Sequence, residues 1–262
     1  MTSAQLIAFD FDGVICDGLI EYFQTAWKAY REIFKSSGES SGDQPPEGLA
    51  EKFYPLRPVI ETGWEMPVLI QALMKGAEAE QIVKEWPQMA LPFLAEAGVT
   101  QAQSVQALDG VRDRQINSDL QSWLNLHRFY PGMVNRISEL LKEDFPVYII
   151  STKEGRFIKA LLSQSGLDFP TERIVGKEVK RPKYETLRLL KEKHCAPNIW
   201  FVEDRLPALL EVKEQSDLSE VKLFLADWGY NLEADREIAR QDPRINLLSL
   251  SQVVQEFDGW PA

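Results

Sequence analysis

Two carboxylates stand two residues apart near the start of the chain, at the end of an apolar run. The segment "LIAFDFDG" extends from Leu6 to Gly13 and contains Asp10 and Asp12, separated by Phe11. Residues i and i+2 of a strand point to the same side, so both carboxylates are expected to project from the strand's carboxyl end. Adjacent carboxylates repel each other, and their hard oxygens suit Mg²⁺ as a companion cation. The pattern predicts a magnesium site, with solvated turn aspartates as the alternative.

Polar residues also follow two later apolar runs. "YIISTK" ends its run at Ser151 and Thr152, whose hydroxyl groups can donate hydrogen bonds to a phosphate oxygen. "WFVED" ends in Glu203 and Asp204, which supply two more acids. The carboxyl ends of parallel strands meet at one edge of an open α/β sheet, where ligands bind. We therefore expect these residues and the first aspartates to share one site.

A basic stretch precedes a helical pattern between these two runs. In "KRPKYETL", Lys180, Arg181 and Lys183 are each placed to bring a cation to the same edge. A cation there would stabilise the oxygens of a transferring phosphoryl group. The solvated face of a basic turn is the alternative for each of them.

The second half of the chain alternates strand-like and helical segments. Strands are predicted at 6–10, 146–150, 173–176, 198–204 and 221–227, with helices at 156–166, 183–194 and 206–215 between the later ones. This alternation predicts an α/β fold, a doubly wound parallel sheet of Rossmann-like type with helices on both faces. The first strand is continuously apolar, which is typical of the centre of such a sheet.

Residues 18–128 show a different pattern, in which helical segments dominate. Helices are predicted at 20–34, 66–77 and 118–129. We interpret this region as a helical insertion in the α/β domain.

Composition excludes several functional classes. The 262 residues are 44% hydrophobic and 26% charged, with a formal net charge of −11. That charge disfavours general binding to nucleic acid or to an anionic membrane surface. No apolar run approaches the roughly 20 residues that span a bilayer. The first residues, "MTSAQ", lack the basic start of a signal peptide, and two widely separated cysteines fit a reducing compartment, so we predict a cytoplasmic protein.

These motifs, in this order, resemble those of the haloacid dehalogenase-like (HAD) hydrolase superfamily. "DFDGV" is similar to its first motif, which implies that Asp10 is the nucleophile and Asp12 the acid/base. Ser151 matches the second motif and Lys183 the third, with Lys180 as the alternative lysine. "VED" resembles the acidic fourth motif. "FYPGM" and "ADWGYN" further resemble segments of phosphoglycolate-phosphatase-like members.

The resemblance implies a domain organisation and a reaction. Residues 1–17 and 129–262 would form the HAD core, and residues 18–128 the helical C1 cap. A small phosphorylated metabolite would be hydrolysed through an aspartyl-phosphate, with Mg²⁺ as cofactor. The implied metal ligands are Asp10, Asp12, Glu203 and Asp204, and the implied phosphate-binding residues are Ser151, Thr152 and Lys183.

The sequence departs from the family pattern at the fourth motif. Many members carry a further aspartate four or five positions after the first, where this chain has Ala208 and Leu209. Glu203 beside Asp204 is expected to serve instead, as in members with a double-acid motif. The alternatives are a phosphomutase or phosphonatase on the same fold, or a non-catalytic regulatory protein. Asp12 argues against a dehalogenase, because dehalogenases lack that acid.

Overall fold

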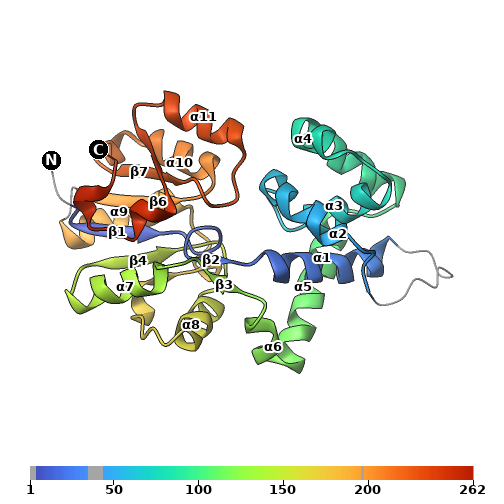
Figure 1. Ribbon diagram of the computed structural model, residues 1–262, viewed down its shortest axis with the longest axis horizontal. Helices are drawn as coiled ribbons and strands as arrows, with labels where there is room; N and C mark the ends of the chain where they lie inside the picture. Colours follow the sequence, from blue (N-terminus) through green and yellow to red (C-terminus); the bar gives the residue numbers. More distant parts are fainter. Residues whose placement is uncertain (1–3, 35–43, 196–197, 262) are drawn as a thin grey trace. The chain divides into compact units, whose positions relative to one another are not determined.

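The computed structural model describes residues 4–34, 44–195 and 198–261. The chain divides into two compact units (Figure 1). The core unit consists of Met1–Asp17 and Arg128–Ala262, and the helical unit of Gly18–His127.

A six-stranded parallel sheet forms the centre of the core unit. Its strands, in spatial order, are β5 (Ile174–Val175), β4 (Val147–Ile150), β1 (Leu6–Phe9), β6 (Ile199–Glu203), β7 (Lys222–Ala226) and β8 (Ile245–Leu248). All neighbours in this order pair in parallel. β1 lies between β4 and β6 and is buried along its length, as the continuous apolar run predicts. The predicted α/β fold with a parallel sheet is confirmed.

Helices of the core unit pack against this sheet. They are α7 (Met133–Lys142), α8 (Gly155–Gln164), α9 (Lys183–His194), α10 (Leu206–Lys213), α11 (Glu233–Gln241) and α12 (Leu250–Val253). On one face, Ala8 and Phe201 belong to an apolar cluster with Leu187 of α9 and Leu209 of α10. Alternate strand residues point to the other face. There Trp200 contacts the rings of Phe224 and of Phe257 and Trp260 from the C-terminal segment.

A short antiparallel pair stands where the chain leaves the core unit and returns to it. β2 (Cys16–Asp17) pairs with β3 (Arg128–Phe129), so that Asp17 lies opposite Arg128. This strand corrects the helix predicted over 118–129. The Asp119 side chain accepts the Ser122 N–H and starts α6 (Leu120–Leu124), which ends well before the strand.

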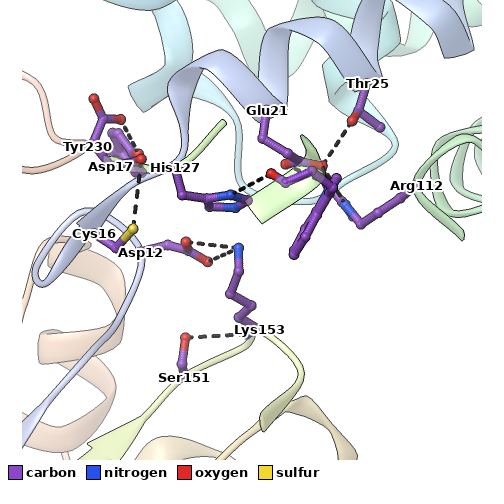
Figure 2. Close-up of polar contacts among 11 residues, drawn as sticks. Asp12, Cys16, Asp17, Glu21, Thr25, Arg112, His127, Ser151, Lys153 and Tyr230 are labelled. Atoms are coloured by element: carbon purple, nitrogen blue, oxygen red, sulfur yellow. Dashed lines mark hydrogen bonds and ion pairs between the residues drawn. The ribbon is translucent and has the colours of Figure 1, made fainter. Parts of the chain in front are cut away.

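The helical unit contains six α-helices within the described residues. They are α1 (Leu19–Ile33), α2 (Leu49–Phe53), α3 (Glu65–Met74), α4 (Ala79–Glu96), α5 (Gln101–Ser118) and α6. A buried acid, Glu21 of α1, joins three of them (Figure 2). Its carboxylate accepts hydrogen bonds from the Thr25 hydroxyl (2.9 Å), from Arg112 Nε (2.8 Å) and from Trp123 Nε1 (3.2 Å). Across the described residues, no helix combines the length and the apolar character needed to cross a membrane.

Candidate active site

The ends of β1 and β6 bring acids of the first and fourth motifs together. Phe9 pairs with Val202, and the Asp10 N–H donates to the Val202 carbonyl (2.9 Å). β1 therefore ends one residue earlier than predicted, and Asp10 is the first residue beyond it. Glu203 ends β6 and Asp204 follows it, so the three acids lie at one edge of the sheet.

Three carboxylates form a buried cluster at this edge. One oxygen from each of Asp10, Glu203 and Asp204 lies within 4.8 Å of the other two. Burial raises the pKa of Asp10 to about 6, against the opposing effect of Lys183. Burial, with Glu203 and Asp10 close by, also raises the pKa of Asp204 well above its usual value. Such a cluster needs compensating positive charge, because buried carboxylates of like charge are costly.

Lys183 supplies part of this charge from the first turn of α9. Its Nζ lies 2.9 Å from Asp10 Oδ1 and 2.5 Å from Glu203 Oε2. Burial lowers the pKa of Lys183, but Asp10 and Glu203 outweigh this effect and raise it above its usual range. Lys180, the alternative lysine, is exposed. The geometry thus brings Lys183 to the cluster, and not Lys180.

Glu203 has hydrogen-bond partners on both carboxylate oxygens. Oε2 accepts from Lys183, and Oε1 accepts the N–H groups of Asp204 (3.2 Å) and Arg205 (3.0 Å). These contacts fix the Glu203 side chain and hold the lysine over the cluster.

Asp204 is held on one side and open on the other. Its Oδ2 accepts the Tyr230 N–H (2.7 Å), and its carbonyl oxygen accepts from Asn231 Nδ2 (3.0 Å). Oδ1 is buried and has no hydrogen-bond partner among residues 4–34, 44–195 and 198–261. Gly13, at φ +84°, packs against this carboxylate so closely that a Cβ there would lie 2.0 Å from Oδ2.

Asp12 is not one of the three acids of this cluster. Its carboxylate pairs with a lysine instead (Figure 2). Lys153 Nζ lies 3.1 Å from Asp12 Oδ1 and 3.3 Å from Oδ2. The Lys153 N–H donates to Ser151 Oγ (3.2 Å). Lys153, in the turn that follows β4, therefore contacts two of the predicted site residues, Asp12 and Ser151. Ser151 is buried at the end of β4, whereas Thr152 is exposed.

Comparison with known families identifies the family of this chain. Residues 4–209 match the model of the haloacid dehalogenase-like hydrolases. The chain belongs to this family. None of the curated proteins matches the sequence significantly.

Solved structures of similar fold include other members of the family. A haloacid dehalogenase-like family hydrolase from Streptococcus pneumoniae shares 15% identity with a TM-score of 0.57, covering 94% of this chain and 95% of its own. A predicted phosphatase from Clostridium acetobutylicum shares 15% identity with a TM-score of 0.58, and the alignment covers 97% of each chain. A predicted phosphoglycolate phosphatase from Haemophilus somnus shares 15% identity with a TM-score of 0.56, and the alignment covers 88% of each chain. At this identity the likeness concerns the fold alone.

The acidic cluster of this haloacid dehalogenase-like hydrolase fits a divalent cation. The unpartnered oxygen of Asp204 is buried next to the Asp10 carboxylate, and a buried acceptor without a donor is a costly arrangement. Carboxylate oxygens are the ligands that Mg²⁺ prefers. The residues present therefore suit a metal that binds Asp10 and Asp204.

Helix α10, which begins two residues after Asp204, contributes no acid to the cluster that the described residues of this hydrolase form. Leu209, at the place of the later family aspartate, is fully buried in the apolar core. The loop after β7 supports Asp204 instead, through Tyr230 and Asn231. Sequence analysis singled out this loop, "ADWGYN", only as a family resemblance.

Lys153 is the residue of the site that sequence analysis missed. It stands in the quoted segment "YIISTK", two residues after Ser151. Its position in a turn gives no indication of where the side chain points, so the sequence offered only its charge as a signal.

Proposed function

We propose that this hydrolase is a magnesium-dependent phosphatase that acts on a small phosphorylated metabolite through an aspartyl-phosphate on Asp10. The observation that supports this best is the position of the Asp10 carboxylate, buried beside both the Lys183 ammonium and the acid Asp204. Nucleophile, fixed cation and metal ligands then share one strand-end edge. Mg²⁺ at this edge would neutralise charge between the phosphate and the nucleophile.

The proposed metal ligands are the side chains of Asp10 and Asp204 and the backbone carbonyl of Asp12. Glu203 is the further ligand predicted from the double-acid motif. Its contacts favour a different role, because both of its oxygens already accept hydrogen bonds. We therefore assign Glu203 to the positioning of Lys183.

The first chemical step forms the covalent intermediate. An oxygen of the Asp10 carboxylate attacks phosphorus, and the bond from phosphorus to the leaving oxygen breaks. Asp12 gives its proton to that oxygen. Lys183 and the hydroxyl groups of Ser151 and Thr152 bind the phosphoryl oxygens, whose negative charge must be matched through the transfer.

The second step releases phosphate. Asp12, now a carboxylate, takes a proton from a water molecule, whose oxygen attacks phosphorus and breaks the bond to Asp10. Inorganic phosphate leaves, Asp10 is again a free carboxylate, and Asp12 is protonated for the next cycle. No other reactant is consumed.

We further propose that residues 18–128 act as the cap that selects the substrate, with the core formed by residues 1–17 and 129–262. In the family such a cap closes over the substrate and excludes water. The net charge of −11 favours a small-molecule substrate over nucleic acid or a membrane surface. We place the enzyme in the cytoplasm, in line with its two unpaired cysteines.

Phosphate release from p-nitrophenyl phosphate, phosphoglycolate, sugar phosphates and nucleotides tests the proposal. Activity is expected with Mg²⁺ and should disappear in EDTA. Asp10→Asn should abolish the phosphoenzyme, because an amide is a poor nucleophile, whereas the exposed Asp168→Asn should leave it unchanged. Mass spectrometry of the trapped intermediate should place the phosphoryl group on Asp10. Full activity without metal, or a phosphoryl group on Asp12 or Ser151, would contradict the mechanism. Return of the phosphoryl group to the substrate would indicate a mutase, and cleavage of a carbon–phosphorus bond a phosphonatase.

A further inference from the structure

Lys153 contacts a residue of the proposed mechanism without being assigned a role in it. Its Nζ faces both oxygens of Asp12, at 3.1 Å and 3.3 Å (Figure 2). Both side chains are largely buried, with exposed fractions of 9% for Lys153 and 16% for Asp12. An ion pair of this kind is less screened than one on the surface and restricts both partners.

The backbone of Lys153 is fixed from two sides. Its N–H donates to Ser151 Oγ (3.2 Å), and its carbonyl oxygen accepts the Lys177 N–H (3.0 Å). The second bond ties the turn after β4 to the turn after β5. The long lysine side chain therefore starts from a fixed backbone position, so that its ammonium can fix the position of the Asp12 carboxylate.

Asp12 lies outside the group of acids that Lys183 contacts. Asp10, Glu203 and Asp204 gather their carboxylates in one cluster, and the Asp12 carboxylate lies outside it. Lys183 contacts Asp10 and Glu203 on the α9 side, so its charge is already engaged there. Lys153 supplies a second cation, from a different strand end.

We propose that Lys153 is a positioning residue that holds the Asp12 side chain where it reaches the leaving oxygen of the substrate. The inference rests on the proposed phosphatase function and on the acid/base role of Asp12. Lys153 acts through Asp12 and not on the phosphoryl group, because its ammonium can donate to the carboxylate of Asp12 and, when Asp12 is protonated, to the oxygen that carries no proton. A general acid displaced by about 1 Å can lose on the order of 10²-fold in rate.

Leaving-group dependence distinguishes this role from substrate binding. An alkyl phosphate needs protonation of its leaving oxygen, whereas p-nitrophenolate leaves without it. The ratio kcat/KM reports steps up to phosphoenzyme formation. Lys153→Met should therefore lower kcat/KM for an alkyl phosphate by about 10²-fold and change it little for p-nitrophenyl phosphate. Because Asp12 also activates water, the variant should accumulate phosphoenzyme with p-nitrophenyl phosphate.

Asp12→Asn provides the matched test. If Lys153 acts through Asp12, adding Lys153→Met to Asp12→Asn should change kcat/KM by no more than about twofold, because the two effects are not independent. Lys153→Arg keeps the charge and should recover part of the activity. Lys159→Met, an exposed lysine of α8, is the control and should behave as wild type. Thermal unfolding of each variant checks its folding, and Lys153→Gln replaces any Met variant that fails to fold.

Two results would overturn the inference. One is a loss of kcat/KM that is equal for the two leaving groups and that Lys153→Met causes again, by the same factor, in the Asp12→Asn background. This result would mean that Lys153 binds the phosphoryl group directly. The other is a Lys153→Met enzyme that behaves like Lys159→Met. In both cases the wild type is active, so the phosphatase proposal stands. Failure of the wild type to release phosphate from any ester would instead refute the proposed function.

Discussion

Glu203 and Asp204 are neighbours in the sequence, yet their carboxylates meet different groups. Glu203 accepts hydrogen bonds on both oxygens, whereas Asp204 keeps one buried oxygen without a partner among the described residues. Asp204→Asn should therefore raise the Mg²⁺ concentration needed for half-maximal activity by at least about 10-fold, an effect seen even for groups that only support a metal ligand. Magnesium titration of phosphatase activity, with calorimetry of Mg²⁺ binding, measures it.

Glu203→Gln is the control for this assignment. It should leave the Mg²⁺ requirement close to that of the wild type and lower kcat, because an amide holds the Lys183 ammonium less firmly than a carboxylate does. The opposite order, with Glu203→Gln weakening the metal and Asp204→Asn sparing it, would show that the double-acid motif binds metal through Glu203.

The positions of several site residues could be predicted because each stands at the end of an apolar run or at the start of a helix. Asp10, Asp204 and Lys183 converge for this reason. Lys153 could not be placed in this way. The direction of its side chain depends on a turn fixed by Lys177, a contact between two loops that no local pattern encodes.

At the scale of elements, the turn after β1 depends on one glycine. Gly13 has φ +84°, and a Cβ there would lie 2.0 Å from Asp204 Oδ2. Gly13→Ala should displace Asp204 and abolish metal-dependent activity. Gly166 follows α8 with a similar φ of +81°, and a Cβ there would meet nothing within 4 Å.

Gly166→Ala is thus the matched control for Gly13→Ala. It should cost about 1–2 kcal/mol of stability for the left-handed backbone and leave activity intact. Thermal unfolding and magnesium titration of both variants separate the two effects. Equal activity of Gly13→Ala and Gly166→Ala would show that the contact with Asp204 is unimportant.

Two ion pairs join α1 to α5, and their burial sets what each contributes. Glu21 is buried and accepts from Arg112, whereas Glu32 pairs with Arg114 at the surface. Glu21→Ala should destabilise the protein by about 3–5 kcal/mol, because it removes the buried carboxylate and leaves Arg112 with only the more distant, exposed Asp109 (3.8 Å) as an acidic neighbour among the described residues. Glu32→Ala should cost no more than about 1 kcal/mol. Chemical denaturation measures both, and similar losses would refute this reading of the buried cluster.

Elements with strong local signals were predicted closely, and those that depend on distant pairing were not. α9 covers the predicted Lys183–His194, since Pro182 precedes it and Cys195 ends it at φ +47°. β8 (Ile245–Leu248) was missed, because a short strand at the sheet edge has little pattern of its own. β2 and β3 have two residues each, and each of them forms only by pairing with the other, which lies far away in the sequence.

At the scale of the whole molecule, the helical unit enters and leaves through neighbouring residues. Asp17 and Arg128 are opposite one another in the β2–β3 pair, and the helical unit lies between them in the sequence. Antiparallel neighbours of this kind are about 4.5–5.5 Å apart and can be joined by a two-residue turn. All six strands of the parallel sheet, with the acidic cluster, belong to the core unit. We therefore expect the core unit to fold without the insertion.

We expect a variant in which Asn-Gly replaces residues 18–127 to unfold cooperatively on heating and to bind Mg²⁺. It should hydrolyse p-nitrophenyl phosphate, because Asp10, Asp204 and Lys183 contact one another within the core unit. It should lose discrimination among metabolite phosphates, because the proposed selecting residues have been removed. The same deletion with Asp10→Asn is the control for contaminating phosphatase. A variant that folds, binds Mg²⁺ and keeps the wild-type order of substrates would show that selection resides in the core unit. One that does not fold would show that the sheet needs the helical unit for its stability.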